Sequence, residues 1–148
     1  MDLSSDYSDL LKLFNKDRVK YLLVGAYAVI FYTEPRYTKD LDLWVEPDQD
    51  NARKVFRALG KFGAPLKGIS SEDFTKKGMI YQIGVAPVRI DVLMDIGGIA
   101  FAAAWKNRRR SVYAGVPINV IGLAELKKAK IAANRPQDRL DLEKLEKL

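Results

Sequence analysis

The sequence predicts an α/β protein, of the α+β kind, with a small mixed β-sheet, helices covering one side of that sheet, and two helices at the C-terminal end. Three observations lead to this fold class. Helical and β-rich stretches alternate in the first part of the chain, two β-rich stretches then follow each other closely, and the chain closes on two helical stretches. Since 148 residues is the size of one domain, we expect residues 1–148 to form a single unit. The side of the sheet without helices is then available for a site.

The first half of the chain alternates between helical and β-rich stretches. Leu10 and Phe14 recur at helical spacing behind Ser and Asp residues that are suited to a cap. Gly25 closes one β-rich stretch and Pro47 closes another, while Asp48 is suited to cap the helix that follows. The expected elements are a helix over residues 4–16, a strand over 19–25, a helix over 26–32, a loop over 33–39, a strand over 40–46 and a helix over 48–61.

The second half begins with a glycine-rich stretch, residues 60–78, that we expect to be irregular. Ala86 and Pro87 separate two β-rich stretches, a pattern that suits a hairpin. Gly115 divides a further extended stretch, and Pro136 stands where the first turn of a helix accepts proline. The expected elements are strands over residues 79–85 and 88–95, a helix over 99–108, two extended runs within 110–121, and helices over 122–133 and 136–146.

Composition limits the chemistry of the chain. The sequence has no cysteine and no histidine, which excludes disulfides, thiolate nucleophiles, Cys or His metal ligands and the commonest general base. The proton acceptors and metal ligands of an enzyme must then be carboxylates, which favour hard ions such as Mg²⁺ or Mn²⁺. The formal net charge of +6 suits a polyanionic partner such as a nucleotide or RNA, without demanding one.

The sequence gives no sign of a membrane span or a signal peptide. Its longest apolar stretch, residues 96–105, is far shorter than a span, and its first residues are acidic where a signal peptide would be basic. We therefore expect a cytoplasmic protein without a membrane partner.

Two carboxylates stand close together in the stretch YTKDLDLWV, residues 37–45. Because side chains alternate along a strand, Asp40 and Asp42 share one face while the apolar residues between them face the core. Asp91 has the same relation to the apolar residues of its own strand. If the two strands are neighbours, the three carboxylates share one face and repel one another unless a cation or Arg89 compensates. A solvated strand face remains the alternative interpretation.

The spacing of these groups permits a site for metal ions and phosphate. Carboxylates two residues apart on a strand are separated by about 6.5 to 7 Å at Cα, which lets them straddle two divalent ions. Gly25 ends the preceding strand, and the helix that begins near Ala26 would present backbone N–H groups to an anion. A single glycine after a strand is most often only a turn, so the anion site depends on the carboxylates nearby.

Basic residues support a weaker hypothesis. Residues 106–110, KNRRR, together with Lys127, Lys128 and Lys130 would form a track for RNA. Charged runs are more often solvated helix faces, and this alternative stays open.

The order LLVGAYAVI, PRYTKDLDLWV and VRIDVL resembles the minimal nucleotidyltransferases of the DNA polymerase β superfamily. In that superfamily a Gly-Gly or Gly-Ser turn opens a helix, a strand carries Asp-x-Asp, and a later strand carries a third Asp. The chain is most similar to the compact prokaryotic branch of toxin-type and stand-alone proteins, and the likeness continues through GLAELKKAKIAANRPQDRLDLEKL at residues 122–145. It implies metal-dependent transfer of an NMP group from an NTP to a hydroxyl of RNA, such as a tRNA end, or of a protein, with release of pyrophosphate.

The resemblance also assigns roles to individual residues. Asp40, Asp42 and Asp91 match the ligands of two Mg²⁺ or Mn²⁺ ions, and Asp91 also matches the general base. The residues expected at the NTP are Gly25, Ala26, Arg36, Thr38 and Lys130.

Departures from the family pattern leave alternative functions open. Ala26 stands where the family has Gly or Ser, so the turn keeps its N–H but lacks a hydroxyl and tolerates positive φ poorly. Arg135, Asp138 and Asp141 match the closing pattern, but we interpret them as ion pairs of a capped helix. The alternatives are a catalytically weak or inactive nucleotide-binding module that acts through a partner subunit, as in a toxin–antitoxin pair, and a basic RNA-binding protein with incidental carboxylates.

Overall fold

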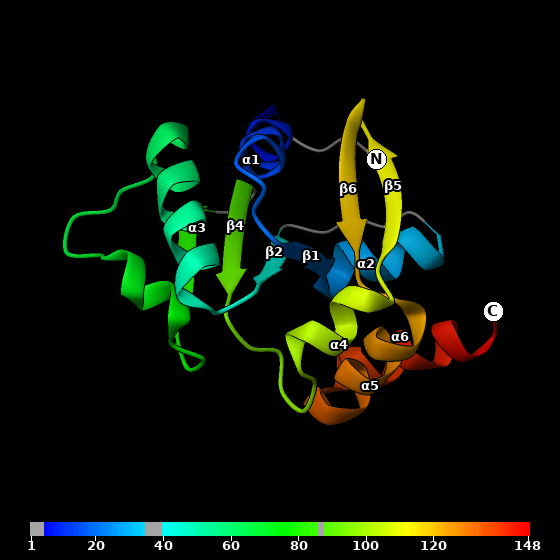
Figure 1. Cartoon of the computed structure of the whole chain (residues 1–148). Helices are drawn as coiled ribbons and strands as arrows, with labels where there is room; N and C mark the ends of the chain where they lie inside the picture. The colour runs from blue at the N-terminus through cyan, green and yellow to red at the C-terminus, as the bar shows by residue number, and fades with distance from the viewer. Residues whose placement is uncertain (1–4, 35–39, 86–87) are drawn as a thin grey trace.

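The computed structural model describes residues 5–34, 40–85 and 88–148, and these residues form a mixed six-stranded sheet with helices around it (Figure 1). The strands are β1 (Tyr21–Val24), β2 (Asp40–Val45), β3 (Ile80–Val85), β4 (Val88–Leu93), β5 (Arg109–Tyr113) and β6 (Val116–Val120). Their order across the sheet is β3-β4-β2-β1-β6-β5. The pairs β2–β4 and β1–β6 are parallel and the other pairs are antiparallel. The predicted fold class, with a mixed sheet and closing helices, is confirmed.

The helices mostly follow the predicted ranges. The strand β1 and the helix α4 are shorter than expected, and a 3₁₀ turn, η1, lies within the stretch that was expected to be irregular. The helices are α1 (Ser5–Lys16), α2 (Gly25–Tyr32), α3 (Gln49–Phe62), η1 (Ser71–Thr75), α4 (Phe101–Lys106), α5 (Leu123–Ala133) and α6 (Pro136–Glu146).

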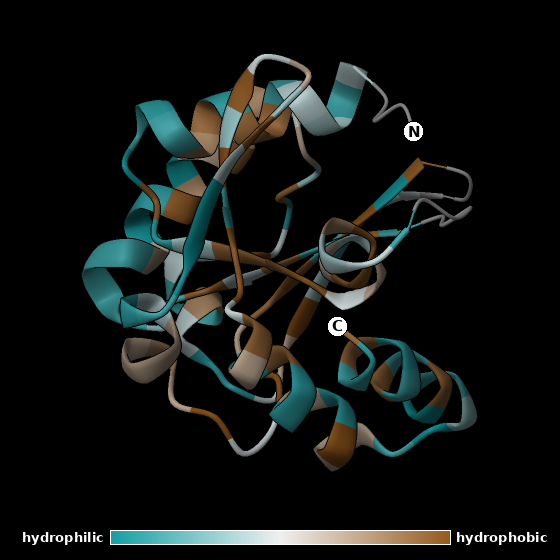
Figure 2. Ribbon diagram, turned by 90° about the vertical axis from the view of Figure 1, so that its right-hand side faces the viewer, coloured by the Kyte–Doolittle hydropathy of each residue, from teal (hydrophilic) through white to brown (hydrophobic). Residues whose placement is uncertain are grey.

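The helices α1, α2 and α3 lie on the apolar face of the sheet. Leu23 and Leu41 of the central strands meet Leu11 of α1 and Tyr27 of α2 around one apolar cavity, and α3 contacts both α1 and β2. Figure 2 shows the result, with hydrophobic strands in the interior and hydrophilic residues on the outer sides of the helices. Burial of this apolar surface is the main term that stabilises the fold.

The opposite face of the sheet carries the acidic residues and is covered only in part. The ring of Trp44 on β2 packs edge-on against Phe101 of α4, with ring centroids 5.0 Å apart. The helices α5 and α6 pack against each other, and Figure 1 shows them with α4 at the lower end of the molecule. The side of the sheet that was expected to be open is therefore partly covered, and the area left for a site lies between the central strands and these closing helices.

Asn51 ties the two central strands to α3. Asp48 caps α3 as predicted, since its carboxylate accepts a hydrogen bond of 2.7 Å from the Asn51 backbone N–H. The buried Asn51 side chain accepts a hydrogen bond from the Lys20 N–H and donates to the Lys20 and Glu46 carbonyls. The start of β1, the end of β2 and the first turn of α3 are thereby held together.

The strands of the one predicted hairpin pair as expected, and the two extended runs expected about Gly115 form a second pair. The strands β3 and β4 pair antiparallel, although Ala86 and Pro87 between them lie outside the described residues. The strands β5 and β6 pair about Gly115, whose φ is +78°. Asn134 ends α5 in the left-handed conformation, with φ +50°, and so leads the chain into α6. Among the described helices, none has the length and apolar character needed to cross a membrane.

Candidate active site

The strands β2 and β4 bring together the acidic residues that were singled out in the sequence. Their parallel register places Asp42 opposite Asp91 and Asp40 opposite Arg89. Residues paired in this way point to the same face of a sheet, so the three carboxylates share one face, as the alternation predicted. Leu41, between the two aspartates of β2, is fully buried on the other face. The register itself joins the two halves of the predicted site.

The carboxyl group of Asp42 is the most strongly perturbed acid of the site. Burial raises the pKa of Asp42 to about 7, and the negative charges of Asp91 and Asp40 contribute in the same direction. The positive charge of Arg89 lowers this pKa, but its effect is smaller than those of burial and the two aspartates. A cation placed at Asp42 would favour the ionised carboxylate and would remove this penalty.

Arg89 lies between the other two carboxylates. Its Nη2 is 2.9 Å from Asp40 Oδ2 and 3.3 Å from Asp91 Oδ2. Its Nε is 3.2 Å from Asp91 Oδ1, but these two buried atoms lack hydrogen-bond geometry with any partner. The guanidinium thus joins a residue of β2 to a residue of β4 through an imperfect set of contacts.

The chemistry of the donor set fits a hard divalent cation. Of the three carboxylates, those of Asp40 and Asp91 contact the Arg89 guanidinium, and the buried Asp91 Oδ1 accepts no hydrogen bond from the described residues. Carboxylate oxygens are the ligands that Mg²⁺ and Mn²⁺ prefer. Over the described residues, no three acidic side chains are already arranged to hold one metal ion. Asp40 and Asp91 point their oxygens at Arg89 instead.

Gly25 begins α2 directly against the Asp42 carboxylate. Its φ of +68° lies in the left-handed region, and a Cβ at this position would collide with Asp42 Oδ2. Val24, the N-cap residue of α2, makes no side-chain capping hydrogen bond. Val24 therefore does not cap the first N–H groups of α2, which include that of Ala26, and these groups lie beside the Asp42 carboxylate. This arrangement agrees with the phosphate site expected at Gly25 and Ala26, whose binding role stays a prediction.

Gly25→Ala is expected to destabilise the protein by about 2 to 4 kcal/mol, since the positive φ and the collision with Asp42 both count against a Cβ. Gly68→Ala is the matched control, because Gly68 also has positive φ, +78°, but has open space around its Cα. The control should lose only about 1 to 2 kcal/mol. Urea unfolding of both variants measures the difference, and equal losses would mean that the contact with Asp42 is unimportant.

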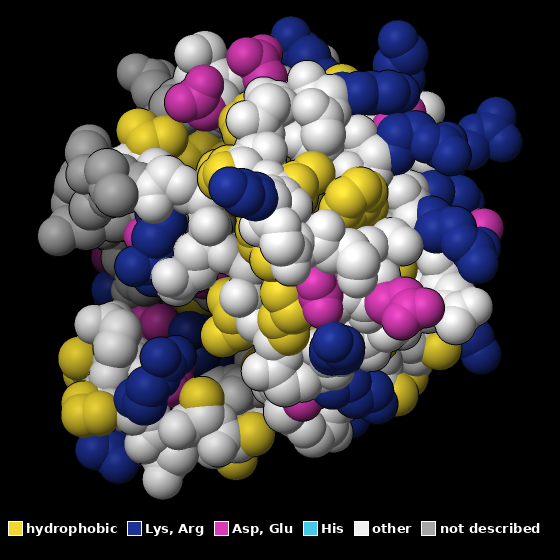
Figure 3. Space-filling model, turned by 90° about the vertical axis from the view of Figure 1, so that its left-hand side faces the viewer, with side chains coloured by type: hydrophobic (Ala, Val, Ile, Leu, Met, Phe, Trp, Pro, Cys, Tyr) yellow, Lys and Arg dark blue, Asp and Glu magenta, His cyan; other side chains and the backbone are white. Residues whose placement is uncertain are grey.

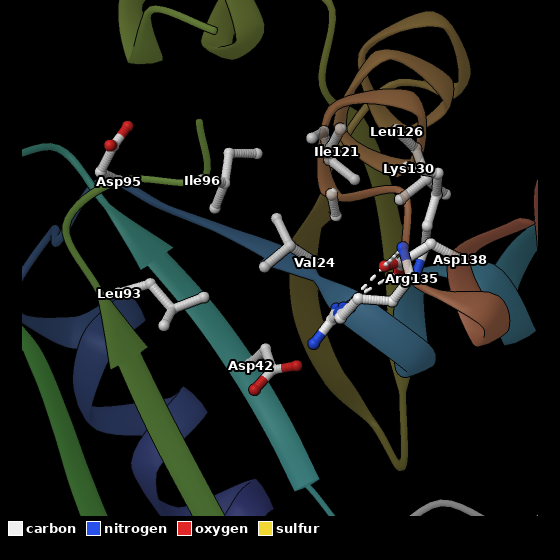
Figure 4. Close-up of a pocket in the computed structure, with 13 residues that line it drawn as sticks. Val24, Asp42, Leu93, Asp95, Ile96, Ile121, Leu126, Lys130, Arg135 and Asp138 are labelled. Atoms are coloured by element: carbon white, nitrogen blue, oxygen red, sulfur yellow. Dashed lines mark hydrogen bonds and ion pairs between the residues drawn. The ribbon is translucent and has the colours of Figure 1, made fainter. Parts of the chain in front are cut away.

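A pocket of about 200 Å³ lies between the sheet and the closing helices (Figure 4). Gly25 and Asp42 form part of its wall, and Lys130 and Arg135 face them from the α5–α6 hairpin. In Figure 4 the guanidinium of Arg135 extends from the hairpin toward Asp42. The sequence interpretation missed other lining residues, which include Val24, Leu93, Ile96, Ile121 and Leu126.

Strand alternation holds a signal for one of these missed residues. Leu93 has the same parity as Asp91, so it could have been placed on the site face from the sequence. Ile121 and Leu126 come from the closing part of the chain, and no local pattern connects them with the acidic strands.

Lys130 belongs to a second, buried cluster of charges. Its Nζ lies 3.1 Å from Asp138 Oδ1 and 3.1 Å from Asp141 Oδ2, and the three side chains are 9%, 2% and 1% exposed. Arg135 Nε donates to Asp138 Oδ2 at 2.7 Å. Burial alone would raise the pKa of Asp138, but hydrogen bonds from Arg135 and Lys130 bring it below its usual value. These contacts agree with the ion-paired, capped helix that we inferred, whereas phosphate contact by Lys130 stays a prediction.

The remaining predicted residues lie elsewhere. Arg36 and Thr38 fall outside the described residues. Two residues of the proposed RNA track do not have free side chains on the surface. Lys130 is buried, and the guanidinium of Arg108 lies 3.9 Å from the centroid of the Trp105 ring. On the face shown in Figure 3, Lys and Arg side chains gather along one edge, with carboxylates between them.

The fold matches solved nucleotidyltransferase structures, although no family model and no curated protein matches the sequence. The lincosamide antibiotic adenylyltransferase LnuA, in its lincomycin-bound form, is 16% identical with a TM-score of 0.60, over 97% of this chain and 96% of that one. A candidate nucleotidyltransferase from Thermotoga maritima, TM1012, is 13% identical with a TM-score of 0.61, over 99% and 96%. The ANT(2")-Ia complex with adenylyl-2"-tobramycin is 11% identical with a TM-score of 0.59, over 95% and 85%. The chain therefore has the nucleotidyltransferase fold.

Proposed function

We propose that this protein transfers an NMP group from an NTP to a hydroxyl group and releases pyrophosphate. One observation carries the proposal, namely that Asp42 lies opposite Asp91 on adjacent parallel strands while its carboxylate touches Gly25 at the start of α2. A nucleoside triphosphate with its metal ions can bind to acidic metal ligands and to a helix N-terminus. Asp42 and Gly25 supply one of each, and both line the same pocket.

The residues of the chain have distinct roles in this reaction. Asp40, Asp42 and Asp91 would hold two Mg²⁺ ions, which supply charge neutralisation of the phosphates and lower the pKa of the attacking hydroxyl. The N–H groups of Gly25 and Ala26 bind the triphosphate and orient its α-phosphorus. Asp91 accepts the proton of the acceptor hydroxyl. The acceptor oxygen forms a bond to the α-phosphorus as the bond to pyrophosphate breaks.

The short chain is compatible with catalysis on an acceptor. LnuA has been solved with lincomycin bound, and the match covers 96% of its chain, so a protein of this extent holds an acceptor in that case. For the present protein we propose a hydroxyl of RNA, such as a tRNA end, or of a protein partner. Small hydroxylated molecules form a third group to test, because two of the similar structures contain lincomycin and adenylyl-2"-tobramycin.

Incubation with α-labelled ATP, CTP, GTP or UTP and Mg²⁺ tests the proposal. We expect label to appear in one acceptor class among total RNA, total protein and small hydroxylated compounds, and we expect Asp91→Asn to lower the rate by about a thousandfold. Asp50→Asn is the control, since the Asp50 side chain is 77% exposed on α3. Equal label transfer by wild type and Asp91→Asn would refute the assignment of the base.

The second candidate is a nucleotide-binding module of weak activity that acts through a partner subunit, such as an antitoxin. Ala26 favours it, because the first turn of α2 offers a backbone N–H without the hydroxyl that Gly-Ser turns supply. A Mg²⁺-dependent rise in melting temperature with an NTP, without transfer to any acceptor, would identify the module. Absence of any nucleotide-dependent shift would count against both candidates.

A further inference from the structure

We propose that Arg89 competes with divalent cations for Asp40 and Asp91, so that metal binding requires the guanidinium to move out from between them. This inference rests on the proposed function, since it concerns the metal ions of that site. It assigns a role to a residue for which the family resemblance implied none. It also explains why Asp40, Asp42 and Asp91 share one face of the sheet but, among the described residues, are not arranged to hold one metal ion.

The contacts of Arg89 use the oxygens that a metal would need. Asp40 Oδ2 lies 2.9 Å from Nη2, and both oxygens of Asp91 lie within 3.3 Å of the guanidinium. A cation bound by Asp40 and Asp91 would have to share these oxygens with Arg89, next to a like charge. Coulomb repulsion and direct competition for lone pairs therefore act together against simultaneous occupancy.

The Lys130 cluster shows what a permanently paired cation looks like in the same protein. Lys130 and its two aspartates are at most 9% exposed, and both ion-pair distances are 3.1 Å. The side chains of Arg89 and Asp40 are instead 36% and 34% exposed, and that of Asp91 is 10% exposed. Exposed pairs hold together weakly, so the contact of Arg89 with Asp40 is easier to break than the contacts of Lys130.

Local geometry also lets the Arg89 side chain move while its backbone stays in place. Its departure breaks the two hydrogen bonds of Nη2, to Asp40 and Asp91, but none at Nε, because the buried Nε and Asp91 Oδ1 lie 3.2 Å apart without hydrogen-bond geometry. The backbone is fixed independently, because the Arg89 carbonyl accepts a hydrogen bond of 3.2 Å from the Tyr7 hydroxyl and the residue pairs with Asp40 across the strands. Rotation of the side chain alone would release both carboxylates.

The competition has a physical benefit for the metal-free protein. Three carboxylates on one face repel one another, and the guanidinium offsets part of that repulsion until a metal ion replaces it. Removal of the positive charge should therefore have two opposite effects. It should weaken the metal-free fold and strengthen metal binding.

Mn²⁺ affinity of neutral variants tests this inference without reference to activity. In Arg89→Met and Arg89→Gln, the dissociation constant for Mn²⁺, measured from the EPR signal of free Mn²⁺ without nucleotide, should fall by about tenfold or more at low salt. The melting temperature of these variants should be lower than that of wild type without metal, and should rise more when Mn²⁺ is added. Arg89→Lys should remain close to wild type because it keeps the charge.

Arg57→Met serves as the matched control, because Arg57 is exposed on α3. It should leave Mn²⁺ affinity unchanged. One outcome is that wild type binds Mn²⁺, Asp42→Asn does not, and neither neutral Arg89 variant binds more tightly than wild type. In that case the competition is wrong and the proposed function stands. If neither wild type nor the neutral variants bind Mn²⁺, the inference and the metal-dependent function both fail.

A second measurement uses the unaltered side chain and does not depend on the folding of any neutral variant. The Nε–H signal of Arg89 in a ¹⁵N NMR spectrum, identified by its loss in Arg89→Lys, should shift and exchange faster with water as Mg²⁺ is added. An unchanged signal at saturating Mg²⁺ would show that the guanidinium stays in place and would overturn the inference.

Discussion

Asp42→Asn is expected to make the metal-free protein more stable while it reduces NMP transfer by about a thousandfold or more. The two effects have the same origin. The Asp42 carboxyl group has a pKa of about 7 because it is buried beside Asp91 and Asp40, so its ionised form is costly without a cation. An amide of the same shape removes that cost and also removes a metal ligand. The gain in stability at pH 8 should be roughly 2 to 4 kcal/mol.

The pH dependence of this effect has a definite sign. Because the pKa of Asp42 rises from 3.8 to about 7 on folding, the folded protein holds this proton more tightly than the unfolded chain. The contribution of this group to stability is fully present below pH 3.8 and is lost as the pH rises to about 7. The difference in stability between Asp42→Asn and wild type should therefore grow from pH 4 to pH 8.

Urea unfolding in EDTA across this pH range measures the stability difference. Asp50→Asn is the control, since the 77%-exposed Asp50 side chain pairs with Lys54 on the surface of α3 and should show no comparable trend. Saturating Mg²⁺ should stabilise wild type and should not stabilise Asp42→Asn. Destabilisation of Asp42→Asn at pH 8 without metal would contradict the interpretation of Asp42 as an uncompensated acid.

Lys130→Met is expected to destabilise the protein by about 3 to 5 kcal/mol. The substitution keeps the apolar length of the side chain but leaves the side chains of Asp138 and Asp141, which are 2% and 1% exposed, without their shared cation. Asp138 keeps its contact with Arg135, but the two buried carboxylates then have one cation fewer, a cost that packing cannot offset. Lys128→Met, at an exposed position of the same helix, should change stability by less than about 0.5 kcal/mol.

Two further variants distinguish the ion pair from other effects of the lysine. Lys130→Arg should retain most of the stability, because it keeps a cation at the two aspartates. In Lys130→Met with Asp141→Asn, the loss should be smaller than the sum of the two single losses, since the second change removes one unbalanced charge. Equal stability of Lys130→Met and Lys128→Met would show that the buried cluster does not hold the α5–α6 hairpin in place.

Acidification should weaken the same cluster. The pKa of Asp138 is held below its usual value by hydrogen bonds from Arg135 and Lys130, which outweigh the opposite effect of burial. For a carboxyl group with a lowered pKa, the stabilisation is present above the ordinary carboxyl pKa and is lost as the pH falls through the folded value. In acid, wild type should therefore lose stability relative to Lys130→Met, whereas it gains stability relative to Asp42→Asn.

The two clusters thus divide the buried charges into a structural part and a part that we propose to be reactive. Lys130, Asp138 and Asp141 are deeply buried, and the lysine pairs with both aspartates. Asp42 lines the pocket, its pKa is raised by burial and by the charges of Asp91 and Asp40, and Arg89 compensates this effect only in part. When replacement of an acidic residue makes a protein more stable, that residue is typically kept for ligand binding, because it does not contribute to the stability of the fold.

The sequence by itself determined the chemistry that is open to this protein and the face on which its acidic residues lie. Without His or Cys, carboxylates are left as bases and metal ligands. Strand alternation, a local property with a period of two, was sufficient to place Asp40, Asp42 and Asp91 on one side of the sheet. The cap at Asp48 is equally local, and it too was predicted correctly.

Only the tertiary structure decided which of these groups meet. The parallel register that sets Asp42 against Asp91, the position of Arg89 between two carboxylates and the burial of Lys130 all depend on segments that are distant in the sequence. Pairing and burial are non-local because the packing of the whole sheet and its helices selects them. For the same reason, a lysine expected at a phosphate lies 3.1 Å from each of two buried aspartates, and no local pattern reveals that contact.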